Sequence, residues 1–538
     1  MKMTNLLLIL MAVLMVSLSG VPGLFGRRRS ALGQRIASAL MTLGGAVGLC
    51  GAALSLLPGA ARSFSLAWPL PIGGFVVDVD ALSVFFLVPV FLIPVMGSFF
   101  GMEYWKQSLN PLTGKGLRFF YGLLTGSMAM VVMARDSVLF LIVWEVMAVS
   151  AFFLAATDHT RPEVQRAAWI YLVAAHVGTG CLMALFCLMR RLTGSFDLHA
   201  INSISMPPAM AGSLFVLAVA GFGFKSGIMP LHFWLPGAHA NAPSHVSAVM
   251  SGVMLKMGVY GMMRMASLLP APEMWWGAGL LGVGVVTGIL GMAFALGQSD
   301  LKRLLAYSSI ENIGIITMGL GLALLGRVMN RFDLVALGLG GSLLHVWNHS
   351  LFKSLLFLNS GSIIHAAHTR NMDLMGGLAA RMPQTAGLFL LGAVAICGLP
   401  PLNGFVGEWL IYLGLFRSVI PADGPVALMT GLAVVALAMI GALALACFVK
   451  LYGAVFQGTA RGEHGAKAHD PGPWMLRPLM MLGAGCVLLG LLPQLVIPIL
   501  NRAVSAWLAG PVGVVCPIAS VAPLGWLTAT GLCLLFGG

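Results

Sequence analysis

The chain has 538 residues, of which 59% are hydrophobic and only 9% are charged, and its mean hydropathy is +0.95. These values exclude a soluble globular protein, because too few polar side chains are present to cover a soluble surface of this size. The net charge of +13 does not indicate nucleic-acid binding, since the basic residues lie mostly in short segments that flank apolar stretches.

Apolar stretches of about twenty residues, the length needed to cross a bilayer, recur almost from end to end of the chain. In chain order they predict spans at 4–24, 36–57, 80–102, 117–134, 137–156, 166–189, 208–229, 246–267, 274–296, 304–326, 334–359, 385–418, 425–456 and 474–499, with a last apolar segment at 511–536. We therefore expect an all-α, polytopic membrane protein with about fourteen or fifteen transmembrane helices.

The opening segment has the pattern of a signal peptide, because Lys2 precedes an apolar core that ends in small residues. The cluster Arg27–Arg29 favours a retained helix instead, since a cleaved signal should not be followed by its strongest positive cluster. If the first helix runs from outside to inside, seventeen Lys and Arg residues fall in cytoplasmic loops and ten fall outside. The sequence thus predicts a multi-pass protein of the inner or plasma membrane with its N-terminus outside.

Two predicted spans contain Gly and Pro in their interior: GFGFKSGIMP at 221–230 and CGLPPLNGFVGEWL at 397–410. Proline removes a backbone donor and clashes with the preceding turn, so both helices should be interrupted. Two broken helices in comparable places of two halves are typical of an inverted-repeat transporter. We expect N-terminal helices with an outer-side, strand-like hairpin at 64–79, and four parts in all: 1–116, five-helix repeats at 117–267 and 268–456, and C-terminal helices at 457–538.

Four ionisable residues lie deep inside predicted spans, namely Glu145, Lys225, Lys256 and Glu408. A charge at the bilayer centre costs about 2.5 to 3.5 kcal/mol, so each is a candidate proton-transfer residue. Pairing with Glu145 could hold Lys225 charged and breaking the pair could release its proton, although a static ion pair between helices is the alternative. Lys256 offers a second such site, in a position too central for easy access to the headgroups. Glu408 could act as the terminal acceptor or donor.

Histidines lie between these charges. His176 falls in one span, while His345, His349 and Lys353 are spaced i, i+4, i+8 and share one helical face. Such a stripe can carry protons because imidazole titrates near neutrality, and histidines merely hydrogen-bonded between helices are the alternative. No third ligand lies nearby in sequence, so no metal is expected.

Other polar and reactive residues are less informative. The string LKRLLAYSSIENIG gives one span a polar start, in which Glu311 is expected either to pair across helices or to take part in function. The eight cysteines form no CxxC pair, so neither an iron–sulfur cluster nor a disulfide framework is indicated.

Several strings together resemble a known family. They are FKSGIMPLHFWLPGAHANAPSHVSAVMSGVMLKMGVYG, DLKRLLAYSSIENIGII, NHSLFKSLLFLNSGSIIH and GLPPLNGFVGEWLI, and they cover the core of the chain, roughly 80 to 460. They resemble the antiporter-like membrane subunits of respiratory complex I, of Mrp-type cation/proton antiporters and of membrane-bound hydrogenases. The strings AAWIYLVAAHVGT, APSHVSAVMSG and SSIENIG look most like the large membrane subunits of hydrogenase-4 and formate hydrogenlyase complexes.

The resemblance implies fourteen core helices with two inverted five-helix repeats and a polar axis through the membrane centre. It implies the following matches to the family's functional residues: Glu145 to the fifth-helix glutamate, Lys225 and Lys256 to the seventh- and eighth-helix lysines, His345 and His349 to the eleventh-helix connecting histidines, and Glu408 to the twelfth-helix residue. That last residue is glutamate in the complex I M-type subunit and lysine in the L- and N-types. Related hydrogenase subunits usually continue into a longer C-terminal region, whereas this sequence stops at LTATGLCLLFGG, so bracing of neighbouring subunits is less expected than proton handling.

These observations predict a proton-translocating membrane subunit of a hydrogenase-4, formate hydrogenlyase or NADH–quinone oxidoreductase-like complex. Redox chemistry in partner subunits would alter the Glu145–Lys225 pair and move a proton through Lys256 and the histidine stripe towards Glu408. The implied partners are other membrane subunits, membrane lipid and a peripheral module of nickel–iron hydrogenase or quinone-reducing type. The chain itself is expected to hold no cofactor and no electron-transfer site. The alternatives are a cation/proton antiporter that moves protons or sodium without electron transfer, and a membrane anchor of a hydrogenase or carbon-uptake module.

Overall fold

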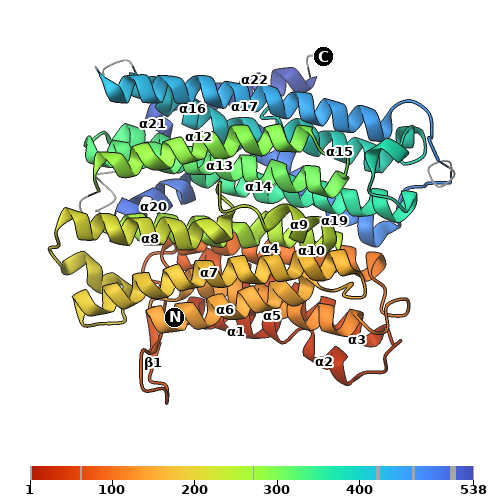
Figure 1. Cartoon of the computed structure of the whole chain (residues 1–538), viewed down its shortest axis with the longest axis horizontal. Coiled ribbons are helices and arrows are strands. Elements are labelled where there is room, and N and C mark those ends of the chain that lie inside the picture. The colour runs from red at the N-terminus through yellow and green to blue at the C-terminus, as the bar shows by residue number, and fades with distance from the viewer. Residues whose placement is uncertain are drawn as a thin grey trace. The chain divides into compact units, whose positions relative to one another are not determined.

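The computed structural model describes residues 3–60, 63–270, 272–419, 424–462, 467–508 and 516–536, and nearly all of their regular structure is helical (Figure 1). Among these residues, twelve helices are long and apolar enough to cross a membrane. The prediction of an all-α, polytopic membrane protein is therefore confirmed.

Two predicted spans are not among the twelve. The span at 334–359 lies within α14 (Phe332–Ala367), which is 36 residues long but carries the polar residues of the histidine stripe. The span at 385–418 is divided between two shorter helices, α15 (Pro383–Ile396) and α16 (Asn403–Val419). The last apolar segment contains α22 (Leu524–Phe536), and its first residues, 511–515, lie outside the described part of the chain.

The chain divides into two compact units, which are described separately. The first comprises residues 1–226 and 241–271. Its elements in chain order are α1 (Thr4–Ser17), α2 (Val21–Phe25), α3 (Leu32–Ser55), β1 (Ser63–Leu66), β2 (Phe75–Asp78), α4 (Ala81–Tyr104), α5 (Gly114–Met133), α6 (Ser137–Ala155), α7 (Pro162–Thr193), the 3₁₀ helix η1 (Leu198–Ser203), α8 (Pro208–Ser226), α10 (Ser244–Val249), a π turn (Met250–Met254) and α11 (Leu255–Leu268).

The second unit comprises residues 227–240 and 272–538, and it contains all but the last residue of α9 (Leu235–Asn241). Its further elements are α12 (Met274–Leu296), α13 (Leu301–Val328), α14, the 3₁₀ helices η3 (Met372–Leu374) and η4 (Leu378–Ala380), α15, α16, α17 (Pro425–Phe456), α19 (Pro473–Leu491), η5 (Pro493–Val496), α20 (Ile497–Leu508), α21 (Ile518–Val521) and α22. The inverted symmetry and the repeat boundaries at 116, 267 and 456 stay predictions.

The segment at 64–79 contains the two strands of the chain's described residues. β1 pairs antiparallel with β2, with Ser63 opposite Asp78 and Leu66 opposite Phe75. The chain then passes to Asp80, whose side chain caps α4 by accepting a hydrogen bond from the backbone N–H of Ser83 at 2.8 Å. The hairpin thus delivers two aspartates to the start of α4.

Both predicted helix interruptions are present. α8 ends at Ser226, because Gly227 adopts φ +79°, a conformation that favours glycine, and Pro230 follows within one turn. α15 ends at Ile396, Gly398 adopts φ +62°, and α16 begins at Asn403. Each interruption has an ionisable residue close to it: Lys225 in the last turn of α8 and Glu408 in the second turn of α16.

Each unit contains one candidate span that is completely buried. The most apolar stretches of α13 and of the segment Ser244–Leu268 are completely buried, whereas less than half of the corresponding stretch of α7, α12 or α17 is buried. In the second unit, α13 packs with α12, α16 and α17 around Leu281, Ile315, Ile411 and Leu437. The buried segments are also those that carry Lys256 and Glu311.

Candidate proton-transfer sites

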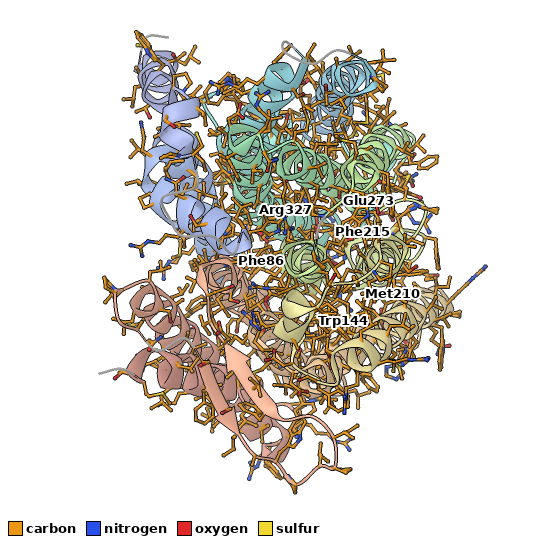
Figure 2. All side chains as sticks on the ribbon, turned by 90° about the vertical axis from the view of Figure 1, so that its left-hand side faces the viewer. Phe86, Trp144, Met210, Phe215, Glu273 and Arg327 are labelled. Atoms are coloured by element: carbon orange, nitrogen blue, oxygen red, sulfur yellow. The ribbon has the colours of Figure 1, made fainter. Side chains whose placement is uncertain are left out.

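Lys225 is held by aromatic side chains of the first unit. Its Nζ donates a hydrogen bond to the hydroxyl oxygen of Tyr171 at 3.1 Å. The same nitrogen lies 5.3 Å from the centre of the Tyr171 ring and 5.5 Å from that of Trp144, which Figure 2 labels on α6. Only 3% of Lys225 is exposed. Cation–π contacts of this kind stabilise a buried ammonium without fixing it in a salt bridge.

Glu145 lies one residue beyond Trp144 and binds side chains of α7. Its carboxylate accepts a hydrogen bond from Oγ1 of Thr179 at 2.5 Å, and its Oε2 lies 3.5 Å from Nε2 of His176. These side chains are partly exposed, with 31% of Glu145 and 53% of His176 accessible. The structure therefore brings Glu145 together with His176.

The predicted Glu145–Lys225 pair is connected indirectly. The hydrogen bond of Lys225 goes to Tyr171, while Glu145 remains within electrostatic range of the ammonium. Sequence reasoning singled out neither Tyr171 nor Thr179. Their separation of eight residues, two turns along the same helix as His176, was the available signal.

Lys256 is fully buried at the start of α11, directly after the π turn Met250–Met254. Its Nζ donates a hydrogen bond to the backbone carbonyl oxygen of Ser251, within that turn. The ammonium therefore does not extend towards the headgroups. π turns occur frequently at functional sites, because they release backbone groups from the regular helical pattern.

The predicted histidine stripe lies in α14 and is completely buried. Nε2 of His345 lies 2.9 Å from Oδ1 of Asn312, and Nζ of Lys353 donates to Oγ of Ser308 at 2.6 Å, so both ends of the stripe contact α13. His349, between them, packs edge-on against Phe352 with 5.5 Å between ring centres. His345 and Lys353 therefore belong to one polar contact zone between α13 and α14, and His349 lies between them on α14.

Two polar residues of α13 extend this zone. Nδ2 of Asn312 donates to the carboxylate of Glu311 and also to the backbone oxygen of Ser308, the latter at 2.8 Å. The string SSIEN thus supplies three groups that contact the stripe or one another. Sequence reasoning identified this string as a polar helix start but could not assign its partners.

Glu408 lies against the interruption between α15 and α16. A side-chain carbon on Gly398 would come within 2.7 Å of Oε2 of Glu408, so the turn passes directly over the carboxylate. A carbon on Gly407 would come within 3.0 Å of Nδ1 of His345, which places this part of α16 beside the histidine stripe. The interruption therefore makes room for the carboxylate that follows it.

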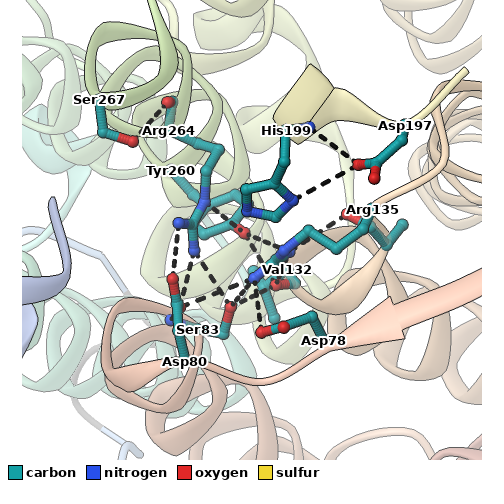
Figure 3. Close-up of polar contacts among 11 residues, drawn as sticks. Asp78, Asp80, Ser83, Val132, Arg135, Asp197, His199, Tyr260, Arg264 and Ser267 are labelled. Atoms are coloured by element: carbon teal, nitrogen blue, oxygen red, sulfur yellow. Dashed lines mark hydrogen bonds and ion pairs between the residues drawn. The ribbon is translucent and has the colours of Figure 1, made fainter. Parts of the chain in front are cut away.

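A cluster of ionic side chains ties together four elements of the first unit (Figure 3). Asp80 accepts two hydrogen bonds from Arg264, at 2.6 and 2.7 Å, and lies 3.7 Å from Arg135. Arg135 lies 3.7 Å from Asp78 and donates to Oγ of Ser83 at 2.9 Å. Sequence reasoning did not predict this cluster, because its residues stand outside or at the ends of the apolar spans.

Tyr260 completes the cluster. Its hydroxyl donates to the backbone oxygen of Val132 at 2.8 Å and accepts from both arginines at 3.2 Å, as Figure 3 shows. Its ring packs edge-on against Phe86, which is labelled in Figure 2, with 5.3 Å between ring centres. Burial alone would raise the pKa of Asp80, but the charges and hydrogen bonds of Arg264 and Arg135 outweigh it and hold this pKa well below its usual range.

The described residues include no group of three or more His, Cys, Asp or Glu side chains placed to hold a metal ion. The groups that these sites contain are amines, imidazoles, carboxyls and hydroxyls, most of them buried inside apolar helices. This arrangement defines a polytopic membrane protein with ionisable groups in its interior.

Comparison with known proteins identifies the class more closely. The transmembrane family described as NADH:quinone oxidoreductase/Mrp antiporter matches residues 134–438. The chain is 38% identical to hydrogenase-4 component B of Escherichia coli strain K12, over 84% of this chain and 67% of that protein. It is 32% identical to formate hydrogenlyase subunit 3 of the same organism, over 86% of this chain and 74% of that protein.

Among solved structures, the Mrp complex of Dietzia sp. DQ12-45-1b contains a similar chain, with a TM-score of 0.79 and 25% identity over 99% of this chain and 55% of that one. The chain thus belongs to the NADH:quinone oxidoreductase/Mrp antiporter transmembrane family. Within that family it is a membrane subunit of the proton-translocating type, and the resemblance to hydrogenase-4 and formate hydrogenlyase subunits is confirmed.

The Asp80–Arg264 pair should contribute strongly to the stability of the first unit. Replacing Asp80 by Asn removes one partner and leaves a buried guanidinium with less compensation, which typically costs about 3 to 5 kcal/mol. Thermal unfolding of the purified protein in mild detergent should show a clear loss of stability for Asp80→Asn. Asp158→Asn is the matched control, since that aspartate forms an exposed pair with Arg161, and it should unfold like the wild type.

The same pair predicts a pH dependence. Because the folded-state pKa of Asp80 is depressed, its contribution to stability is present above the unfolded value of about 3.9 and is lost as the pH falls towards the folded value. The difference in unfolding temperature between wild type and Asp80→Asn should therefore be constant near neutral pH and should narrow below about pH 4. A difference that grew on acidification would contradict this assignment.

Gly398 should be intolerant of a side chain. Alanine there would adopt an unfavourable positive φ at a cost of about 1 to 2 kcal/mol, and its methyl group would collide with Glu408. Gly387→Ala is the control, because a carbon at that position of α15 meets no neighbouring atom. The unfolding temperature should fall for Gly398→Ala and should not fall for Gly387→Ala. Equal unfolding temperatures of the two variants would refute the turn described at Gly398.

Proposed function

We propose that this chain is the proton-translocating membrane subunit of a complex of the hydrogenase-4 or formate hydrogenlyase type, in the inner or plasma membrane with its N-terminus outside. The observation that carries the proposal is that each unit contains ionisable side chains buried within its helices, several of them held by hydrogen bonds to neutral groups that can be exchanged. In the first unit these are Lys225 and Lys256, and in the second they are Lys353, His345, His349 and Glu408.

In the first unit, Glu145 controls the charge of Lys225. While Glu145 is ionised, its negative charge favours the ammonium form of the lysine. Neutralising Glu145, or moving it away, removes that stabilisation, so an N–H bond of Lys225 breaks and the proton passes towards the neutral amine of Lys256, on which a new N–H bond forms. Tyr171 and Trp144 favour the ammonium form less strongly than a contacting carboxylate would, since neither side chain carries a full negative charge, so the lysine can still lose its proton.

In the second unit, the proton moves along α14. Lys353 and His345 are two turns apart on one face, with His349 between them, and each can bind and release a proton. Glu408, beside the interruption in the next span, serves as the terminal acceptor. Movement of one charge against 100 mV costs about 2.3 kcal/mol, so the process needs an external source of free energy.

We infer that this source is a partner. Glu145 and His176 are partly exposed on a pair of spanning helices, and exposing such groups to lipid is costly. Apolar side chains around them, including Val146, Val173 and Val177, are exposed as well. This surface suits another membrane subunit, whose movement would change the surroundings of Glu145.

The redox chemistry would then take place outside this chain. All eight cysteines are free and scattered, so they offer no ligand set for an iron–sulfur cluster. The similarity to hydrogenase-4 component B and formate hydrogenlyase subunit 3 favours a nickel–iron hydrogenase as the peripheral module over a quinone-reducing one. The similarity to a chain of an Mrp complex supports a second candidate, cation/proton exchange without electron transfer.

Replacing Glu145 by Gln or Lys225 by Ala should reduce proton transport at least about tenfold, because each variant removes a group that must change its charge. Redox-driven acidification of inverted membrane vesicles that contain the intact complex measures this loss. Glu163→Gln, at an exposed glutamate paired with Arg161, is the control and should pump normally. Unchanged pumping by Glu145→Gln in a fully assembled complex would rule out the proposed mechanism.

The two candidate functions can be separated with the purified chain in liposomes. Exchange of sodium or potassium for protons under an imposed gradient, without any partner, would favour the antiporter. Absence of exchange, together with co-purification of a nickel–iron hydrogenase from mild detergent, is the result that our proposal predicts. Co-purification with a non-redox carbon-uptake module would instead favour the third function, a membrane anchor for that module.

A further inference from the structure

The second unit contains a buried carboxylate that the transfer route above does not use. We propose that Glu311 is itself a proton carrier, which accepts a proton from Lys353 and passes it to Glu408, and that Asn312 positions it. This inference rests on the proposed function and deepens it by adding an intermediate site.

The location of Glu311 argues against a passive role. It lies in the middle of α13, a helix whose most apolar stretch is fully buried, and only 1% of its surface is exposed. Within the described residues its carboxylate has one hydrogen-bond donor, Asn312, and it forms no ion pair. A carboxylate that merely joined helices would be expected to have a cation in direct contact or several donors, since an ionised group with a single donor is costly to bury.

The hydrogen bonds of Asn312 fix how Glu311 is held. The backbone oxygen of Ser308 can only accept, so the nitrogen of the Asn312 amide must face it, and the same nitrogen donates to Glu311. The amide oxygen of Asn312 then faces His345. Because this oxygen can only accept, Nε2 of His345, 2.9 Å away, must carry the hydrogen and donate it. Asn312 therefore bridges Glu311 and His345 in one defined orientation and sets the tautomer of the histidine.

The neighbours of Glu311 include both a proton donor and a proton acceptor. Lys353 binds Ser308, which lies one turn before Glu311 on α13, and its ammonium interacts electrostatically with the Glu311 carboxylate. Glu408 also interacts electrostatically with Glu311, and the thiol of Cys397, at the start of the helix interruption, lies within range of both carboxyls. Glu311 is therefore within electrostatic range of both the cationic end of the stripe and the terminal acid.

The transfer itself needs no further reactant. An N–H bond of the Lys353 ammonium breaks and an O–H bond forms on Glu311, which converts an ammonium and a carboxylate into a neutral amine and a carboxylic acid. The O–H bond of Glu311 then breaks as one forms on Glu408. When two carboxyls share a site of low dielectric, ionising both of them at once is costly. Glu311 and Glu408 therefore tend to share a single proton.

Glu311→Gln tests this directly, because it keeps the shape and the hydrogen bond to Asn312 but cannot exchange the proton. In inverted vesicles with the intact complex, it should lower redox-driven acidification at least about tenfold. Glu311→Asp, which keeps the acid, should transport clearly better than Glu311→Gln. Thr317→Val is the matched control: it removes a buried hydroxyl of the same helix that bonds only to its own backbone at Ile313, and it should pump normally.

A second measurement distinguishes a carrier from a structural acid. Infrared difference spectra during turnover should contain a carboxyl C=O band that shifts in Glu311→Asp and disappears in Glu311→Gln. Wild-type transport by Glu311→Gln, or an unchanged band, would overturn the inference. If Glu145→Gln abolishes pumping while Glu311→Gln does not, the inference fails and the proposed function stands; if neither variant affects pumping, both fail.

Discussion

The cost of burying charge in a medium of low dielectric governs this structure. Three buried amines donate hydrogen bonds to neutral groups: Lys225 to a tyrosine hydroxyl, Lys256 to a backbone carbonyl, and Lys353 to a serine hydroxyl. A neutral partner stabilises an ammonium less than a carboxylate partner does. The amine therefore remains able to lose its proton. By contrast, Arg264 is bound tightly by Asp80, and guanidinium does not release protons under ordinary conditions.

Departures from regular helix supply the polar environment that apolar spans lack. The interruptions at Gly227 and Gly398 and the π turn before Lys256 each release backbone groups close to an ionisable side chain. The two glycines permit conformations that other residues rarely adopt, and Gly398 also leaves space for the carboxylate of Glu408. The backbone thus takes part in these sites as directly as the side chains do.

The sequence was sufficient to locate the buried charges and both interruptions, because hydropathy makes a lysine or a proline in an apolar span conspicuous. It could not predict that Tyr171, rather than Glu145, receives the hydrogen bond of Lys225, or that Asn312 joins Glu311 to His345. These contacts depend on the rotation of neighbouring helices, which a single sequence does not encode in any local pattern. The aspartate–arginine cluster was not predicted because its charges stand outside or at the ends of the apolar spans, where they are not conspicuous, and because its partners come from distant segments.

The separation of Asp80 and Arg264 by 184 residues has a consequence for biosynthesis. Asp80 and Arg135 are made and inserted long before the guanidinium of Arg264 emerges from the ribosome, so for that interval Asp80 lacks its bidentate partner. Every helix from α4 to α10 is synthesised in the meantime. When α11 is inserted, Arg264 can bind Asp80 and the cluster is complete. The first unit therefore reaches its final packing only when its last helix has been inserted.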